Sequence, residues 1–209
     1  MPAQTFIFVR HGETRMNREL RCQGRIDIEL NETGLAQTRD IAQQLAHVSV
    51  DKIYVSPLKR ARQSAEPLAR TLGLEPQPLD WLLEVNHGAV EGMNRAEADQ
   101  AFPGLFDKWH EFPHTVVFPG GGEDLEDVRA RVAAGLWDIY NRDTGTVLFV
   151  THQVVTQVAR CIIQGWPMAD MWRDKIVNGK HITMALSPQA VERMRSHAME
   201  RPSSKEATE

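Results

Sequence analysis

Residues 5–14 read Thr-Phe-Ile-Phe-Val-Arg-His-Gly-Glu-Thr, an apolar run that passes directly into charged and small residues. A short run rich in β-branched and aromatic side chains predicts a buried strand over residues 5–9. Segments 52–56 and 146–151 have the same character, and segment 182–186 predicts a further, late strand. The chain is therefore expected to build a sheet from segments that lie far apart in the sequence.

Helical patterns separate these strands. A helix is predicted over residues 31–47 with Asn31 as its N-cap, and a second helix is predicted after Lys59. The clearest helix begins at Asp124, and another ends at the stop signal 165–167. Alternating strands and helices predict an α/β fold with a mostly parallel sheet. The apolar faces comprise Leu35, Ala42 and Leu45 in the first helix, Leu125, Val128, Val132, Leu136 and Ile139 in the third, and segment 154–163 in the fourth.

No internal repeat or linker interrupts this pattern, so residues 1–195 are expected to form one domain. Residues 196–209 are polar and lack a periodic apolar set. Such a composition predicts a disordered tail, most clearly from Pro202 onward.

The composition argues against several classes of function. The chain of 209 residues has 24 Lys and Arg against 28 Asp and Glu, a net charge of -4, and its basic residues are scattered, so no nucleic-acid partner is expected. The two cysteines, Cys22 and Cys161, have no zinc-ligand spacing. No apolar run approaches the ~20 residues of a membrane span, and no secretory signal is evident. A cytoplasmic protein without a membrane partner is expected.

Cationic side chains follow three of the predicted strands. Arg10 and His11 come directly after the first strand, His152 follows the strand over 146–151, and Arg60 lies near the start of a helix. The carboxyl ends of parallel strands meet at one sheet edge, where ligands bind. A lone Arg-His pair is more often a surface charge beside a hydrogen-bonded loop histidine, but two histidines at two strand ends favour a functional site. Arg62 fits a solvated helix face better.

Further short motifs accompany these residues: Arg10-His11-Gly12-Glu13-Thr14, Asn17, Gln23-Gly24, Leu30 with Thr33-Gly34, Ser56-Pro57-Leu58-Lys59-Arg60-Ala61, Leu83-Glu84 with Gly88 and Glu91-Gly92, Pro119-Gly120-Gly121 and Val150-Thr151-His152. In this order the chain resembles the histidine phosphatase superfamily, the phosphoglycerate mutase-like enzymes. The resemblance implies a single three-layer domain with a mostly parallel sheet flanked by helices. It also implies a phosphate pocket of Arg10, His11, Arg60 and His152, with Glu84 as the proton donor and no metal or cofactor.

These residue types suit phosphoryl transfer. A neutral imidazole at His11 can attack phosphorus and form a phosphohistidine, which divides hydrolysis into two easier steps. The guanidinium groups of Arg10 and Arg60 match the charge that spreads over the phosphoryl oxygens, and His152 adds a further donor. Glu84 can protonate the leaving group only if burial or phosphate charge raises its pKa. The alternative for Glu84 is a surface carboxylate.

Five more residues are expected to contact the substrate. Asn17 binds phosphate or substrate, or only caps a helix, and Gln23 and Gly24 belong to the same family pattern. His87 lies three positions after Glu84 and is expected to shape substrate preference, favouring a carboxylate-bearing ester; the alternative is a loop histidine bonded to backbone. Gln153, where many relatives carry Gly, adds an amide near the phosphate or caps the following helix.

The favoured function is a metal-independent phosphomonoester hydrolase of the short phosphatase branch. Its expected partner is a small phosphorylated metabolite, such as phosphoserine or a phosphoglycerate-like ester. The sequence leaves open whether the chain forms a homodimer. The compact segment 86–145 disfavours a mutase, which must keep water from the phosphohistidine. A cofactor-dependent phosphoglycerate mutase and a non-catalytic phosphate-binding module are the alternatives.

Overall fold

The four predicted strands form one sheet in the computed structural model, which describes residues 3–200. They are β1 (Ala3–Arg10), β2 (Lys52–Val55), β4 (Gly145–Thr151) and β5 (His181–Ala185). Within these residues the strand order is β3-β2-β4-β1-β5, and only β5 is antiparallel to its neighbour. The two-residue edge strand β3 (Gln77–Pro78) was not predicted, because it has no apolar run of its own.

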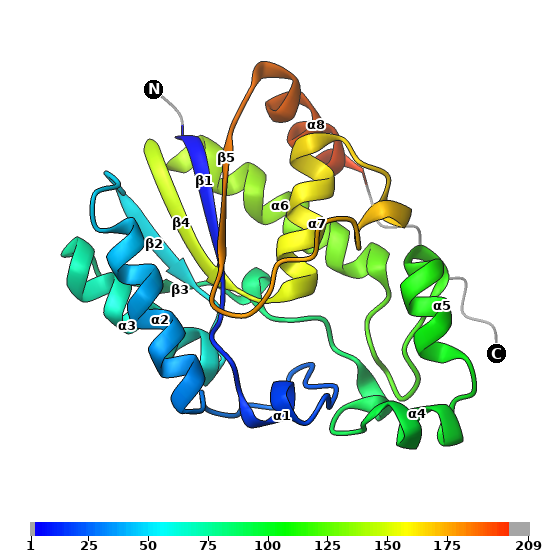
Figure 1. Cartoon of the computed structure of the whole chain (residues 1–209). Coiled ribbons are helices and arrows are strands. Elements are labelled where there is room, and N and C mark those ends of the chain that lie inside the picture. Colours follow the sequence, from blue (N-terminus) through cyan, green and yellow to red (C-terminus); the bar gives the residue numbers. More distant parts are fainter. Residues whose placement is uncertain (1–2, 201–209) are drawn as a thin grey trace.

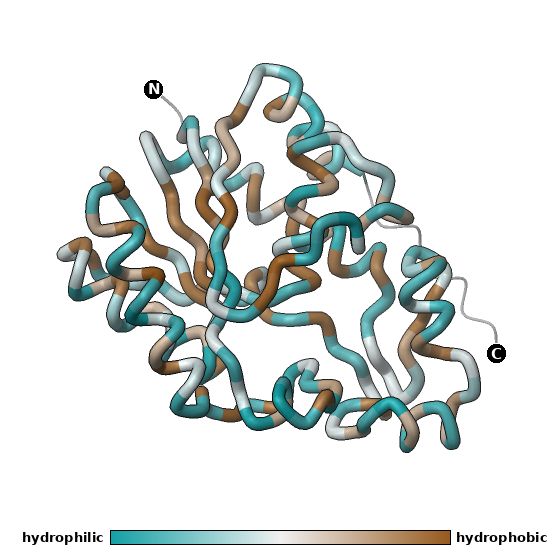
Figure 2. Tube along the Cα trace, in the orientation of Figure 1, coloured by the Kyte–Doolittle hydropathy of each residue, from teal (hydrophilic) through white to brown (hydrophobic). Residues whose placement is uncertain are grey.

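The alternation of side chains along β1 divides the core into two layers. Phe6 and Phe8 point to the face covered by α6 (Leu125–Arg142), α7 (Gln153–Gln164) and α8 (Pro188–Met199). Ile7 and Val9 point to the face covered by α2 (Glu32–Leu45) and α3 (Lys59–Leu72). Figure 1 shows the two helix layers, and Figure 2 shows the apolar strands between them. The predicted three-layer α/β fold is confirmed.

The helix boundaries follow local chemistry. Asn31 caps α2 by accepting from the Gly34 backbone, and Asp124 forms a capping box with Asp127 at the start of α6. Gly165 ends α7 in the left-handed conformation. The expected burial of Leu35 is wrong, because this side chain is 38% exposed. The buried face of α2 instead follows Gly34, Thr38, Ile41, Ala42 and Leu45.

The last helix of the described residues crosses the expected domain boundary at residue 195. Helix α8 continues to Met199, past that boundary. Ala190 and Met194, four residues apart on one helix face, are buried, and α8 packs against α6 and α7. The expected tail therefore begins with an ordered helical turn. Residues 201–209, which include the segment from Pro202, lie outside the described part of the chain.

Short elements connect the strands and the longer helices, and several of them lie on the side of the molecule where the parallel strands have their carboxyl ends. They are α1 (Arg15–Arg18), α4 (Arg95–Ala101), α5 (Leu105–Glu111) and the 3₁₀ turns η1 (Asp80–Leu82), η2 (Gly88–Val90), η3 (Pro113–Thr115) and η4 (Met168–Asp170). Figure 1 shows α1, α4 and α5 along this side of the molecule. Within residues 3–200, no helix is long and apolar enough to cross a bilayer.

Candidate active site

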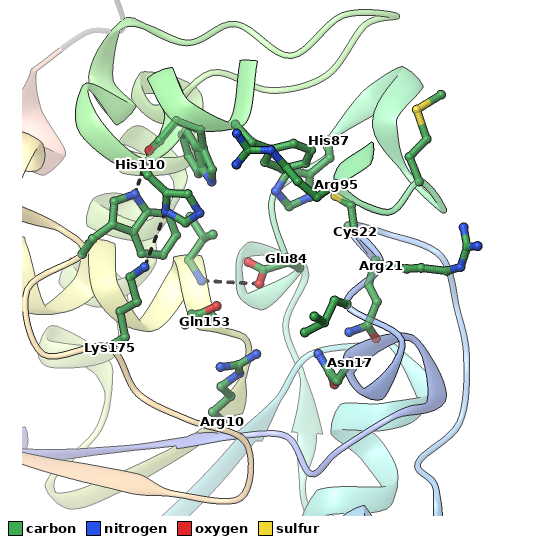
Figure 3. Close-up of a pocket in the computed structure, with 18 of the residues that line it drawn as sticks. Arg10, Asn17, Arg21, Cys22, Glu84, His87, Arg95, His110, Gln153 and Lys175 are labelled. Carbon is green, nitrogen blue, oxygen red and sulfur yellow. Dashed lines mark hydrogen bonds between the residues drawn. The ribbon is translucent and has the colours of Figure 1, made fainter. Parts of the chain in front are cut away.

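A cavity of about 420 Å³ opens at the carboxyl ends of the strands. Its inner half is lined by Arg10, His11, Arg60 and Glu84, which come from β1, α3 and the segment after η1. Its outer half is formed by α5, the start of α4, the segment after α1 and the loop that precedes β5 (Figure 3). The structure therefore brings four of the five predicted catalytic residues into one wall of the cavity.

His11 follows the last residue of β1, and its backbone N–H donates to Thr151 of β4 over 3.0 Å. The ring atom Nδ1 lies 2.7 Å from the Gly12 carbonyl oxygen. Because a carbonyl can only accept, Nδ1 carries the proton and Nε2 keeps its lone pair. Burial, followed by the charges of Arg60 and Arg10, holds the pKa of His11 well below its usual value. The imidazole is therefore neutral near pH 7 and nucleophilic at Nε2.

The loop after His11 is packed without spare room. The Gly12 N–H donates to the Ser64 hydroxyl over 3.0 Å, and Asn178 donates to the His11 carbonyl over 3.1 Å. A Cβ added to Gly12 would lie 2.5 Å from the Gly34 carbonyl oxygen, and one added to Gly34 would lie 2.1 Å from the Glu13 carbonyl oxygen. Both positions need glycine because two backbones approach closely here. The contact fixes the catalytic loop against the start of α2.

Two buried guanidinium groups face the inner cavity. Arg10 donates from Nη1 to the Ile176 carbonyl over 2.8 Å, and Arg60 donates to the carbonyls of Gly24 and Ile26 over 2.7 and 2.8 Å. Neither arginine forms an ion pair with a carboxylate of residues 3–200, and the Nε atom of each is buried without a partner. Burial lowers the pKa of each to about 10, so both stay cationic near pH 7. This arrangement is typical of a site for an anion.

Glu84 lies at the base of the same wall and is 8% exposed. Its carboxylate accepts from the backbone N–H groups of Val85 and Val154 over 3.0 and 3.4 Å. Burial raises the pKa of Glu84, against the opposing effects of these hydrogen bonds and of the two arginines. Arg131 holds the segment by donating to the Leu83 carbonyl over 2.7 Å. The surface-carboxylate alternative is therefore wrong.

His152 is placed differently from the other predicted catalytic residues. It follows β4, is fully buried, and its ring centroid lies 5.1 Å from that of His11. Nε2 lies 2.7 Å from the Ser56 hydroxyl, and Nδ1 is buried without a partner among the described residues. Burial and the charge of Arg60 hold its pKa well below the usual value. The ring is therefore neutral and lies beside His11 rather than in the cavity wall, and its contact with phosphate stays a prediction.

Asn17 and its neighbours serve both structure and cavity. Asn17 closes the capping box of α1 with Thr14 and also lines the cavity, so both of its predicted roles are compatible with its position. Gln23 accepts from the Thr14 hydroxyl over 2.8 Å and lines the cavity as well. Gly24, at φ +50°, holds Arg60 through its carbonyl. Gly24 thus positions Arg60 and also lines the cavity, and its contact with substrate stays a prediction.

The last two predicted contacts, His87 and Gln153, also reach the cavity. The His87 ring packs edge-to-face on Phe118 at 4.5 Å, and its Nδ1 has no described hydrogen-bond partner. Burial lowers the pKa of His87 to about 3, so a neutral ring supplies no positive charge for a carboxylate. Gln153 is the first residue of α7, whose N-cap is His152, so the capping role considered for Gln153 is wrong. Its amide lies 3.5 Å from the Ile176 carbonyl.

The outer half of the cavity was not predicted from the sequence. Its residues follow no predicted strand and belong to short helices and loops, where the sheet-edge argument gives no signal. Within residues 3–200, no three His, Cys, Asp or Glu side chains are grouped as metal ligands. The unpredicted lining residues include Leu20, Arg21, Met93, Arg95, Phe106, Trp109, His110, Trp172 and Lys175.

Comparison with known proteins supports the resemblance to histidine phosphatases that the sequence motifs indicate. The sequence profile of the histidine phosphatase superfamily (branch 1) matches residues 6–195. Phosphoserine phosphatase 1 of Hydrogenobacter thermophilus is 36% identical over 167 residues, 79% of this chain and 79% of that protein. The metal-independent phosphoserine phosphatase of Arabidopsis thaliana is 33% identical over 150 residues, 70% of this chain and 63% of that protein.

Solved structures agree in fold. A mycobacterial glucosyl-3-phosphoglycerate phosphatase in complex with VO3 superposes with a TM-score of 0.81 at 26% identity, covering 87% of this chain and 92% of that one. YhfR of Bacillus stearothermophilus gives a TM-score of 0.83 at 28% identity, covering 88% and 92%. The resemblance inferred from the motifs is thus confirmed. With its profile match, its relatives and its inner cavity in agreement, this chain belongs to branch 1 of the histidine phosphatase superfamily and is a phosphoric monoester hydrolase.

Proposed function

We propose that the protein hydrolyses small phosphomonoesters without a metal, through a phosphohistidine on Nε2 of His11. The observation that carries this proposal is a neutral imidazole with its Nε2 lone pair available, beside two buried guanidinium groups that lack a carboxylate partner in residues 3–200. A phosphate dianion supplies the charge that Arg10 and Arg60 lack, and the guanidinium donors stabilise the charge of the transition state.

In the first step Nε2 of His11 attacks phosphorus in line with the ester oxygen. The N–P bond forms as the P–O bond to the leaving group breaks, and the departing oxygen takes a proton from Glu84. The raised pKa of Glu84 keeps this proton available at a higher pH than an ordinary carboxyl would. The Nδ1–H bond to the Gly12 carbonyl stabilises the positive charge that develops on the ring.

In the second step water attacks the phosphohistidine. Glu84, now ionised, takes a proton from that water, the N–P bond breaks, and inorganic phosphate leaves with His11 again neutral. One carboxyl group thus acts as acid and then as base, as microscopic reversibility requires.

The proposed substrates are small phosphorylated metabolites, including phosphoserine and phosphoglycerate-like esters. Relatives of the chain carry the names phosphoserine phosphatase and glucosyl-3-phosphoglycerate phosphatase. A cavity of about 420 Å³ has room for leaving groups of different sizes. His87, packed between the two halves of the cavity, remains our candidate for shaping preference, through its shape rather than its charge.

The test is to trap the intermediate. Brief incubation with a radiolabelled ester followed by alkaline quench is expected to leave acid-labile label on the wild-type protein and none on His11→Ala. Phosphate release in EDTA is expected to match release in untreated buffer. Loss of activity with the chelator, or near wild-type turnover by a folded His11→Ala variant, would overturn the mechanism, so circular dichroism accompanies both assays.

A second measurement separates hydrolase from mutase. With 3-phosphoglycerate and a bisphosphate primer, free phosphate is expected to form faster than 2-phosphoglycerate. Faster formation of 2-phosphoglycerate than of free phosphate identifies a mutase. If no member of a panel of phosphorylated metabolites is turned over, the protein is a phosphate-binding module.

A further inference from the structure

The outer half of the cavity combines aromatic side chains with one uncompensated positive charge. Helix α5 contributes Phe106, Trp109 and His110, and the loop before β5 contributes Trp172 and Lys175. Figure 3 labels His110 and Lys175 on this side of the cavity. These side chains line the same cavity as His11. The leaving group of an ester bound at His11 can therefore reach them.

The basic residues of this half differ in their partners. Arg21 forms an ion pair with Glu97 at 2.7 Å, and Arg95 forms ion pairs with Asp99 and Asp107 at 2.6 Å each. Lys175 forms no ion pair with a carboxylate of residues 3–200. Arg21 and Arg95 are therefore occupied, and Lys175 is available to an incoming anion.

Lys175 is held by neutral groups. Its Nζ lies 3.5 Å from Nδ1 of His110 and 4.9 Å from the centre of the Trp172 ring. Burial and the nearby Lys175 and Arg95 charges lower the pKa of His110, so its Nδ1 accepts a hydrogen bond from the ammonium group. One of the three ammonium protons is thereby used, and the ring face orients the charge without neutralising it. Two donors remain for a ligand.

The loop that carries Trp172 and Lys175 is fixed at several points. Trp172 donates from Nε1 to the Trp109 carbonyl over 2.8 Å, which joins the loop to α5. Gln157 of α7 donates to the carbonyls of Met171 and Arg173. At its other end, the Ile176 carbonyl accepts from Arg10. The loop that carries Lys175 is thus connected to Arg10 by a hydrogen bond, and Lys175 needs little rearrangement to bind a ligand.

We propose that Lys175 binds a carboxylate at the far end of the substrate's leaving group, whose flat apolar part lies against Trp172 and Phe106. The inference rests on the proposed phosphatase function and names the class of ester on which it acts. A single ammonium beside a neutral imidazole balances one negative charge, which matches a carboxylate and leaves a second phosphate dianion half neutralised. Lys175 thus supplies the positive charge that His87 lacks.

The test uses two esters that differ in one charge. 4-Carboxyphenyl phosphate carries the carboxylate, and 4-carbamoylphenyl phosphate is its neutral isostere. Wild-type kcat/KM is expected to be roughly tenfold higher for the carboxylate ester than for the neutral one, mainly because its KM is lower. A tenfold factor corresponds to the contribution of a single hydrogen bond between charged groups. Lys175→Gln is expected to bring this ratio close to one. Lys108→Gln removes an exposed lysine of α5 that does not line the cavity, and is expected to keep the wild-type ratio.

Equilibrium binding to His11→Ala separates the two proposals, since it does not depend on turnover. A carboxylate preference in Kd that disappears on adding Lys175→Gln supports the inference even if no ester is hydrolysed, in which case only the proposed function fails. A ratio near one in the parent variant, or an unchanged ratio after Lys175→Gln, overturns the inference. Tighter, Lys175-dependent binding of 4-(phosphonomethyl)phenyl phosphate also overturns it, by assigning the site to a second phosphate.

Discussion

The two halves of the cavity are built in opposite ways. The inner half consists mainly of side chains that are almost completely buried, such as Arg60 at 1% and His11 at 3% exposure, together with the partly buried Arg10, and backbone hydrogen bonds fix them. The outer half has mainly exposed or partly exposed side chains on short helices and loops, with Trp109 as a buried exception. Arg95, whose side chain is 45% exposed, has surface carboxylates as its partners. The inner half is suited to chemistry that is common to phosphate esters, whereas the outer half can change with the leaving group. Substitutions in the inner half are therefore expected to lower kcat, and those in the outer half to alter KM and selectivity.

The largest effect is expected at Arg60. Arg60→Met removes a buried charge that faces the phosphoryl group and is expected to lower kcat by about 10³-fold, the usual cost of losing a charged transition-state donor. Arg60→Lys is expected to recover only a small part of the lost kcat. The lysine ammonium group cannot reproduce both hydrogen bonds that the guanidinium group donates to the Gly24 and Ile26 carbonyls. Steady-state kinetics measures both, with exposed Lys59→Met as a control. A Met variant that keeps its kcat but raises KM would remove the distinction between the halves.

Glu84→Gln is expected to slow alkyl esters by about 10²-fold or more and aryl phosphates much less, since aryl leaving groups need little protonation. The pH profile of kcat/KM checks the same assignment. His11 must be unprotonated, and its lowered pKa keeps the wild-type rate high until well below pH 6.5. Glu84 must be protonated, so the rate falls as pH rises through its raised pKa. The Gln variant should lose that alkaline fall. An equal rate loss for both ester types would mean that Glu84 acts in another way.

His87, at the junction of the halves, is expected to make folding depend on pH. Its pKa is about 3 in the folded protein against 6.5 as the ordinary value, so the unfolded chain binds the extra proton as pH falls below 6.5. Stability from this group is complete above pH 6.5 and declines below it, by about 2 kcal/mol at pH 5. Urea unfolding of wild type and His87→Phe at pH 7 and pH 5 measures the difference. The Phe variant should lose less stability between the two pH values, and identical losses would refute a buried neutral His87.

The smallest effect is expected at Leu20, on the rim of the outer half. This residue is 82% exposed and has φ +53°, a left-handed conformation that is unfavourable for leucine. Leu20→Gly relieves the strain, whereas Leu20→Ala keeps it, so the Gly variant is expected to be more stable than the Ala variant by about 0.5–1 kcal/mol. Chemical denaturation compares the two. Both variants should keep the wild-type kcat for phenyl phosphate while KM rises a few-fold. A fall in kcat would mean that Leu20 affects the chemical step, as expected of residues in the inner half.

The inner half could be predicted because a buried strand is visible in the sequence as a short apolar run. The apolar run before Arg10 forces the strand, and the parallel sheet then places His11 beside the end of β4. Glu84 follows no strand and was found only through the family motif. The orientation of His152, which donates or accepts at Ser56 rather than lining the cavity, depends on packing that no local pattern encodes.

The outer half could not be predicted, for a related reason. Lys175 and Trp172 lie in a loop with no periodic pattern, and they meet α5 through tertiary contacts such as the hydrogen bond from Trp172 to the Trp109 carbonyl. Helix α8 was not predicted, because its buried set is sparse, with Ala190 and Met194 among polar neighbours. The edge strand β3 pairs through backbone alone. In each case a tertiary contact, rather than local propensity, fixes the element.

The close approach of Gly12 and Gly34 has a consequence for how this gene can vary. Gly34 lies at the start of α2, 22 positions after Gly12 and away from the cavity lining, yet a methyl group there would press on the backbone of Glu13 and displace the catalytic loop. A mutational scan of α2 should therefore reveal an intolerant position in its first turn, at Gly34, next to a permissive one at Leu35. In natural populations, an inherited alanine at Gly34 would act as a null allele of the phosphatase while leaving every catalytic residue in the sequence.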